Sequence, residues 1–200
     1  MRTDYISPKI MYAIIDDLKP QNALAMELSL YTGLRIGDVV SLPFSALEST
    51  SINYIASKTK KKGSATITHD LFRRLLRNTD GIYLFPSKKS KTGHIARQTV
   101  WKDVKKNVKK KNIVENVAPH SARKVFAVEH LKTEGISAVQ KELQHSDLGT
   151  TLLYCLSDKR LFGMNEEIID RLWGIEEKIN NIERLFYIVD EKLNKILNFY

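Results

Sequence analysis

Several side chains that could do chemistry follow one another along this 200-residue chain. Together they supply two guanidiniums, lysine ammonium groups, two imidazoles and a phenol. In order, they are Arg35, a lysine-rich run at 58–62, His120, Arg123, His145 and Tyr154. Guanidiniums bind phosphate oxygens, imidazoles and ammonium groups carry protons, and a tyrosine hydroxyl can act as a nucleophile. Each group alone is common, but the ordered set is unlikely by chance, so the sequence favours one site for phosphate chemistry.

These residues stand in motifs that resemble the catalytic domain of the tyrosine recombinases, the phage integrase family. The resemblance extends from about Ser7 to Asp158, some three-quarters of the chain. The matching segments are Tyr31–Asp38, the lysine-rich hairpin, Pro119–Arg123, Leu143–Asp147 and Thr150–Tyr154. The resemblance implies a site-specific DNA recombinase that cleaves and rejoins DNA within an oligomeric synapse.

The resemblance identifies Tyr154 as the nucleophile, which would attack phosphorus and leave a 3′-phosphotyrosyl bond and a free 5′ hydroxyl. Arg35 and Arg123 would bind the phosphate, because the pentavalent transition state carries extra negative charge and guanidiniums never lose their own charge. Preorganised donors of this kind each contribute roughly 3–4 kcal/mol. Because the phosphotyrosyl bond keeps the energy of the ester, we expect no cofactor, and the sequence has no cluster typical of metal ligands.

Proton transfer is assigned in the same way. Lys60 lies eight residues before the expected end of the second strand, the spacing usual in the family, so it is the expected general acid, with Lys58 as the competitor. His120 would be a base or hydrogen-bond partner beside the nucleophile, and His145 would donate to a phosphate oxygen. Asp38 takes the place of an acidic residue that commonly supports the first arginine; the alternative is a solvent-facing position.

Charge indicates the partner. The chain has 32 Lys and Arg against 23 Asp and Glu, and residues 1–163 hold 27 of the basic and 15 of the acidic residues. A basic body with a mildly acidic tail is typical of a polyanion binder such as a nucleic-acid-binding protein, with a solvated lysine-rich surface as the alternative. The resemblance implies that this partner is double-stranded DNA. We expect no small-molecule substrate. One expected helix supplies candidate phosphate contacts at Lys102, Lys105, Lys106, Lys109 and Lys110.

Composition limits the class of protein. Apolar residues make up 42% and charged residues 28% of the chain, which excludes collagen-like, membrane-spanning and wholly disordered classes. Cys155 is the single cysteine, so no internal disulfide can form, as in a reducing compartment. No signal-peptide pattern opens the chain. These features predict a cytoplasmic, DNA-associated protein without a membrane partner.

The elements that must hold the site are mostly helices. Proline, glycine and capping residues predict helices over 8–18, 20–32, 36–42, 69–78, 96–110, 119–134, 137–144 and 148–156. Alternation and turn residues predict strands over 51–57 and 64–68, joined by a cationic turn at 58–63. The expected class is α+β, mainly helical, with a small antiparallel sheet in a catalytic domain over residues 1–160.

The last part of the chain has another pattern. From Ile168 to Ile196, apolar residues alternate at spacings of four and three, an unbroken heptad pattern, with Gly174 a slight weakness. This predicts a coiled-coil helix over 164–200 that joins copies of the chain into a homo-oligomer. A long amphipathic helix that lies on its own domain is the alternative.

The start of the chain differs from the family, whose members carry an N-terminal core-binding domain. Only a few residues precede the catalytic domain here, so that domain is expected to be absent. Alternative functions are a one-protomer nicking-closing topoisomerase with the same site, or a non-cleaving DNA-binding accessory protein. A coiled-coil assembly protein with an incidental basic surface would explain the tail but not the ordered motifs.

Overall fold

The computed structural model describes residues 3–87 and 93–143, all of which belong to one compact unit within residues 1–157. The described elements, in chain order, are α1 (Pro8–Ile15), α2 (Pro20–Thr32), α3 (Ile36–Val40), the 3-10 turn η1 (Phe44–Ala46), β1 (Leu47–Glu48), β2 (Ser51–Ile55), β3 (Lys62–Thr66), α4 (His69–Asn78), α5 (Arg97–Lys110), α6 (Pro119–Glu134) and α7 (Ile136–Leu143). The structure confirms the expected mainly helical α+β class. The predicted helix 148–156 and the tail 164–200 lie outside the described residues.

Local signals explain where the first helices begin and end. The Ser7 side chain accepts a hydrogen bond from the Ile10 N–H, and Pro8 occupies the first turn of α1, where no N–H is needed. Gly33 ends α2 in the left-handed region, with φ +65°. That turn lets the chain enter α3 directly, with Arg35 at its N-cap.

The sheet has the order β1-β2-β3 and is antiparallel throughout. Ile55 pairs with Lys62 at the hairpin end, so β3 begins at Lys62 and ends at Thr66, two residues earlier than predicted at each end. The shift has a physical reason, since Thr68 serves as the N-cap of α4 and accepts from the Leu71 N–H. Strand β1 was not predicted because two residues carry no alternating pattern.

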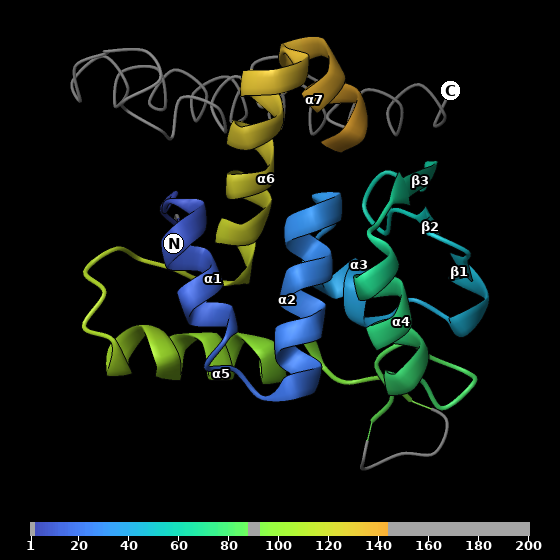
Figure 1. The fold of residues 1–200 in the computed structure, drawn as a ribbon, viewed down its shortest axis with the longest axis horizontal. Coiled ribbons are helices and arrows are strands. Elements are labelled where there is room, and N and C mark those ends of the chain that lie inside the picture. The colour runs from blue at the N-terminus through green and yellow to red at the C-terminus, as the bar shows by residue number, and fades with distance from the viewer. Residues whose placement is uncertain (1–2, 88–92, 144–200) are drawn as a thin grey trace, which may run out of the picture. The chain divides into compact units, whose positions relative to one another are not determined.

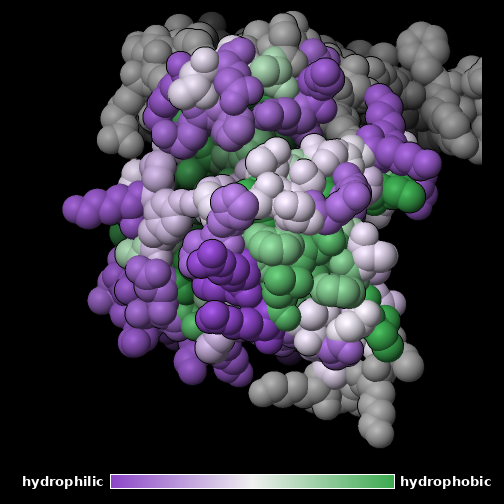
Figure 2. All heavy atoms as spheres, turned by 45° about the vertical axis from the view of Figure 1, so that its right-hand side comes forward, coloured by the Kyte–Doolittle hydropathy of each residue, from purple (hydrophilic) through white to green (hydrophobic). Residues whose placement is uncertain are grey.

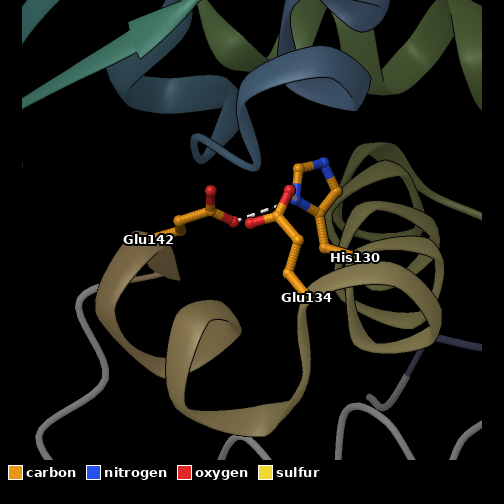
Figure 3. A group of neighbouring side chains, drawn as sticks. All are labelled: His130, Glu134 and Glu142. Atoms are coloured by element: carbon orange, nitrogen blue, oxygen red, sulfur yellow. Dashed lines mark ion pairs between the residues drawn. The ribbon is translucent and has the colours of Figure 1, made fainter.

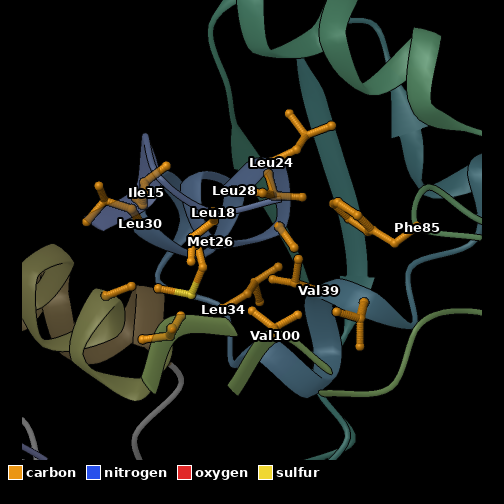
Figure 4. Packing of buried hydrophobic residues seen from close by; sticks show 14 of the residues in the cluster. Ile15, Leu18, Leu24, Met26, Leu28, Leu30, Leu34, Val39, Phe85 and Val100 are labelled. Carbon is orange, nitrogen blue, oxygen red and sulfur yellow. The ribbon is translucent and has the colours of Figure 1, made fainter. Parts of the chain in front are cut away.

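α2 and α6 pack against each other at the centre of the fold, and α5 lies across their lower ends in Figure 1. Figure 4 shows side chains of α2, α3 and α5 meeting in the main core, with Leu28, Val39 and Val100 fully buried. In α6, every residue from Ser121 to Val128 is buried. Arg123 and Lys124 therefore lie inside the protein.

The surface contrasts with this interior. Figure 2 shows hydrophilic side chains over much of one face, around an area where hydrophobic ones gather. None of the described helices is long and apolar enough to cross a membrane.

Candidate active site

The turn after α2 brings the two predicted arginines into one region. Arg35 follows Gly33 by two residues and is half-buried at the start of α3. Arg123 projects from α6 and is only 2% exposed. Its Nη1 donates to the Gly33 carbonyl at 2.5 Å, and its Nη2 donates to the Leu143 carbonyl at 2.7 Å. One guanidinium thus holds the end of α2 and the end of α7.

Gly33 is required at this junction for two reasons. Its φ of +65° is a conformation that other residues rarely adopt, and a Cβ there would lie 2.6 Å from Cδ1 of Phe126. The same Cβ would lie 2.9 Å from Cδ2 of Leu143. The close approach lets the Gly33 carbonyl reach Arg123.

His120 lies next to these cations. His120 lies three residues before Arg123 on α6, and the bond from Arg123 to the Gly33 carbonyl joins this helix to the turn that precedes Arg35. Burial, together with the positive charges of Arg123, Lys124 and Arg35, lowers the pKa of its imidazole from 6.5 to about 4. His120 is therefore neutral at pH 7. A neutral imidazole can accept a proton or a hydrogen bond.

The hairpin loop between β2 and β3 carries the predicted lysines. Lys58 and Lys60 are both exposed, and Lys60 adopts a positive φ of +57° at the turn. The Lys60 N–H donates to the Ala56 carbonyl at 2.8 Å, and the Ala56 N–H donates to the Lys61 carbonyl at 3.0 Å. The backbone of the loop is therefore ordered while the lysine ammonium groups face solvent.

Asp38 contacts this hairpin. Its side chain is 6% exposed, so the solvent-facing alternative is wrong. Its Oδ1 accepts a hydrogen bond from the Ser57 N–H at 3.3 Å, one residue before Lys58. Asp38 thus supports the loop that bears the lysines, and its expected support of Arg35 stays a prediction.

The predicted phosphate-binding lysines of α5 divide into two groups. Lys105 donates to Oδ1 of Asn116 at 2.6 Å, and Lys110 lies 3.6 Å from a carboxylate oxygen of Asp17. Each of these two has a partner within the protein. Lys110 is itself exposed, and so are the three others: Lys102, Lys106 and Lys109.

Sequence reasoning missed Lys124. This lysine is 3% exposed, and its Nζ donates to the Thr3 carbonyl at 2.6 Å. It adds a positive charge near His120 and fastens the N-terminal segment to α6. The sequence carries no clear signal for its burial, because Lys124 follows Ser121 and Arg123 in a polar stretch at the start of α6.

Within residues 3–87 and 93–143, one group of side chains has donors close enough to hold a metal ion. It consists of His130 and Glu134 on α6 and Glu142 on α7, whose side chains point toward one another in Figure 3. Burial and the neighbouring Glu134 carboxylate raise the pKa of the Glu142 carboxyl, while His130 acts in the opposite direction. The group lies at the corner between α6 and α7.

Two predicted catalytic residues, His145 and Tyr154, lie outside the described residues, as does Cys155. The structure therefore brings together Arg35, His120 and Arg123, and holds the hairpin of Lys58 and Lys60 through Asp38. These side chains supply guanidiniums and a neutral imidazole, groups whose chemistry suits an anionic phosphate.

Known proteins resemble this chain in sequence. The chain is 33% identical over 141 residues to the tyrosine recombinase XerD of Rhizobium meliloti (strain 1021), a match that covers 64% of this chain and 45% of the relative. It is 30% identical over 152 residues to the tyrosine recombinase XerD of Staphylococcus saprophyticus, a match that covers 64% of this chain and 48% of the relative. The chain thus spans about half the length of these curated relatives.

Solved structures share the fold. The XerA recombinase superposes with a TM-score of 0.66 at 22% identity, with 88% of this chain and 66% of that chain covered. The catalytic domain of bacteriophage HP1 integrase superposes with a TM-score of 0.58 at 20% identity, with 80% of this chain and 92% of that chain covered. A lambda integrase dimer bound to a core site superposes with a TM-score of 0.66 at 19% identity, with 80% of this chain and 62% of that chain covered. The phage integrase family model matches residues 6–160, and the chain belongs to that family.

Proposed function

We propose that this chain is the catalytic part of a tyrosine-type site-specific DNA recombinase, with Arg35, Lys60, His120, Arg123, His145 and Tyr154 as its catalytic residues. The observation that carries the proposal is the hydrogen bond from Arg123, on the helix that also carries His120, to the Gly33 carbonyl, two residues before Arg35. A site for a phosphodiester needs fixed positive charge and a neutral base in one place. Membership of the family and the XerD relatives support the same conclusion.

Each step follows from the chemistry of these side chains. The Tyr154 hydroxyl gives its proton to His120 and attacks phosphorus, while the guanidiniums of Arg35 and Arg123 stabilise the charge on the non-bridging oxygens. The 5′ oxygen leaves with a proton from Lys60, and a 3′-phosphotyrosyl ester remains. His145 donates a hydrogen bond to a phosphate oxygen. Attack by a 5′ hydroxyl reverses the sequence, so rejoining needs no cofactor.

The assembly belongs to the same proposal. A lambda integrase dimer has been solved on a DNA core site, and XerH on its palindromic difH substrate. By analogy, this chain would act on double-stranded DNA as a homo-oligomer, with the heptad helix 164–200 as the contact between copies. Lys102, Lys106 and Lys109 would contact DNA phosphates, because their side chains are exposed on one helix.

Covalent capture tests the proposal. The protein is mixed with sheared genomic DNA from its source, the reaction is stopped with detergent, and protein-linked DNA is recovered and quantified. We expect adducts with the unaltered chain and none with Tyr154→Phe, while both bind DNA with similar affinity. Adducts that persist in Tyr154→Phe would overturn the assignment of the nucleophile, and DNA binding without adducts would favour a non-cleaving protein.

A further inference from the structure

The corner between α6 and α7 is held by side chains. Gly135 joins the two helices with φ +80°, and no atom of the described residues lies within 4 Å of the position of a Cβ there. The backbone turn is therefore loosely packed. Across it, Nδ1 of His130 lies 3.0 Å from Oε2 of Glu142 and 3.6 Å from Oε1 of Glu134 (Figure 3).

The residue after Glu142 holds the buried arginine. Leu143 accepts the 2.7 Å hydrogen bond from Nη2 of Arg123 through its carbonyl, and its own side chain is 1% exposed. Two consecutive residues at the end of α7 thus contact α6, Glu142 through the imidazole of His130 and Leu143 through the guanidinium of Arg123. A shift of Glu142 moves the Leu143 carbonyl with it, because one peptide unit joins them.

The imidazole of His130 is itself fixed in direction. Its ring stacks on Phe126 with centroids 3.9 Å apart and an interplanar angle of 29°. Phe126 is 4% exposed and packs in the small core with Val139 and Leu143. The stacked ring can turn little without disturbing that core, so Nδ1 remains directed at the Glu142 carboxylate.

From these contacts we propose that His130 and Glu142 are positioning residues for Arg123. The contact between their side chains holds the end of α7 in the place where the Leu143 carbonyl fixes one edge of the guanidinium. This inference rests on the proposed function for its catalytic consequence, since Arg123 is one of the two proposed phosphate-binding arginines. A partly exposed ion pair adds little to global stability, whereas a small misplacement of a catalytic group can lower a rate by about 10²-fold.

The first test needs no activity. In the full chain, the guanidinium N–H signals of Arg123 are observed by ¹H–¹⁵N NMR and assigned by Arg123→Lys, which removes them. We expect that Glu142→Ala and His130→Ala broaden or shift these signals and speed amide exchange in α7, whereas Glu142→Gln, which can still accept a hydrogen bond, has a smaller effect. Unchanged Arg123 signals in both alanine variants would overturn the inference.

A matched control is available on the same helix. Lys132 Nζ lies 2.7 Å from Oε1 of Glu129, an ion pair within α6. Glu129→Ala should leave the Arg123 signals unchanged. If it alters them as much as Glu142→Ala does, the effect comes from the loss of any ion pair in this helix, and the inference is wrong.

The second test measures the catalytic consequence. We expect Glu142→Ala to slow the formation of covalent DNA adducts about 10-fold while DNA affinity stays within twofold, with Glu142→Gln in between. In an Arg123→Lys background the same change should have less than a twofold effect, because the group that it positions is gone. Full additivity of the two changes would overturn the inference. If the unaltered chain forms no adducts, the proposed function fails, and the NMR result decides the inference alone.

Discussion

The carbonyl oxygen of Gly33 accepts a hydrogen bond from Nη1 of Arg123, a residue 90 positions further along the chain. This bond joins the turn that precedes Arg35 to α6, the helix that carries His120 and Arg123. The backbone at Gly33 therefore holds the Arg123 guanidinium and also leads directly to Arg35. The loop that bears Lys60 is fastened separately, through Asp38. The arginines therefore belong to the helical core, and the lysine belongs to a hairpin on the surface.

Gly33→Ala should destabilise the fold strongly. Alanine at φ +65° costs about 1–2 kcal/mol, and overlap of its Cβ with the Phe126 ring adds about 1–3 kcal/mol. Urea unfolding measures the change. Gly81→Ala is the matched control, since Gly81 has φ +89° but no atom of the described residues within 4 Å of its Cβ position. Equal losses in the two variants would show that the Phe126 ring moves aside without cost.

His120 should make the protein less stable in acid. Its pKa is lowered from 6.5 to about 4 in the folded chain, so between these values the unfolded chain binds more protons. Stability contributed by the neutral imidazole is therefore complete above pH 6.5 and falls as the pH decreases, by up to about 3 kcal/mol at pH 4 and below. Above pH 6.5 His120 adds no pH dependence.

Two measurements check this effect. An NMR titration of the His120 ring should give a midpoint well below 6.5. Urea unfolding from pH 7 to pH 4.5 should show a steeper loss in the unaltered chain than in His120→Gln, which carries no titrating ring. Parallel curves for the two proteins would contradict the lowered pKa.

Local signals in the sequence predicted much of the fold. Helix α4 has the predicted bounds, Gly33 ends α2 as expected, and Pro119 begins α6. Such features depend on neighbours along the chain, so a sequence reveals them.

Contacts between distant segments were not predictable in the same way. The burial of Arg123 against two backbone carbonyls depends on where α2 and α7 end in space, and no spacing in the sequence encodes it. The same holds for Asp38, whose partner is a backbone N–H 19 residues away. Any residue type can supply a backbone N–H or carbonyl, so the sequence does not mark the partners of Arg123 and Asp38. The family resemblance therefore identified these two residues but not their contacts.

Asp38→Ala should loosen the lysine hairpin. The change removes the buried acceptor of the Ser57 N–H, which costs about 1–3 kcal/mol when a buried partner is lost. The effect is local, because the bond ties only the start of the loop to α3. We expect faster amide exchange at Ser57 and at Lys60, whose N–H donates to the Ala56 carbonyl in the same loop. Asp38→Asn keeps an oxygen acceptor and should change exchange much less.

Asp80→Ala is the control for the loss of a carboxylate that caps a loop. Oδ1 of Asp80 accepts from the Ile82 and Tyr83 N–H groups, both at 3.0 Å, in a different loop. Its loss should leave exchange at Ser57 and Lys60 unchanged. If Lys60 is the general acid, Asp38→Ala should also slow adduct formation about 10-fold, since a proton donor on a loosened loop is less often in place. Faster exchange with an unchanged cleavage rate would show that the acid does not lie on this loop.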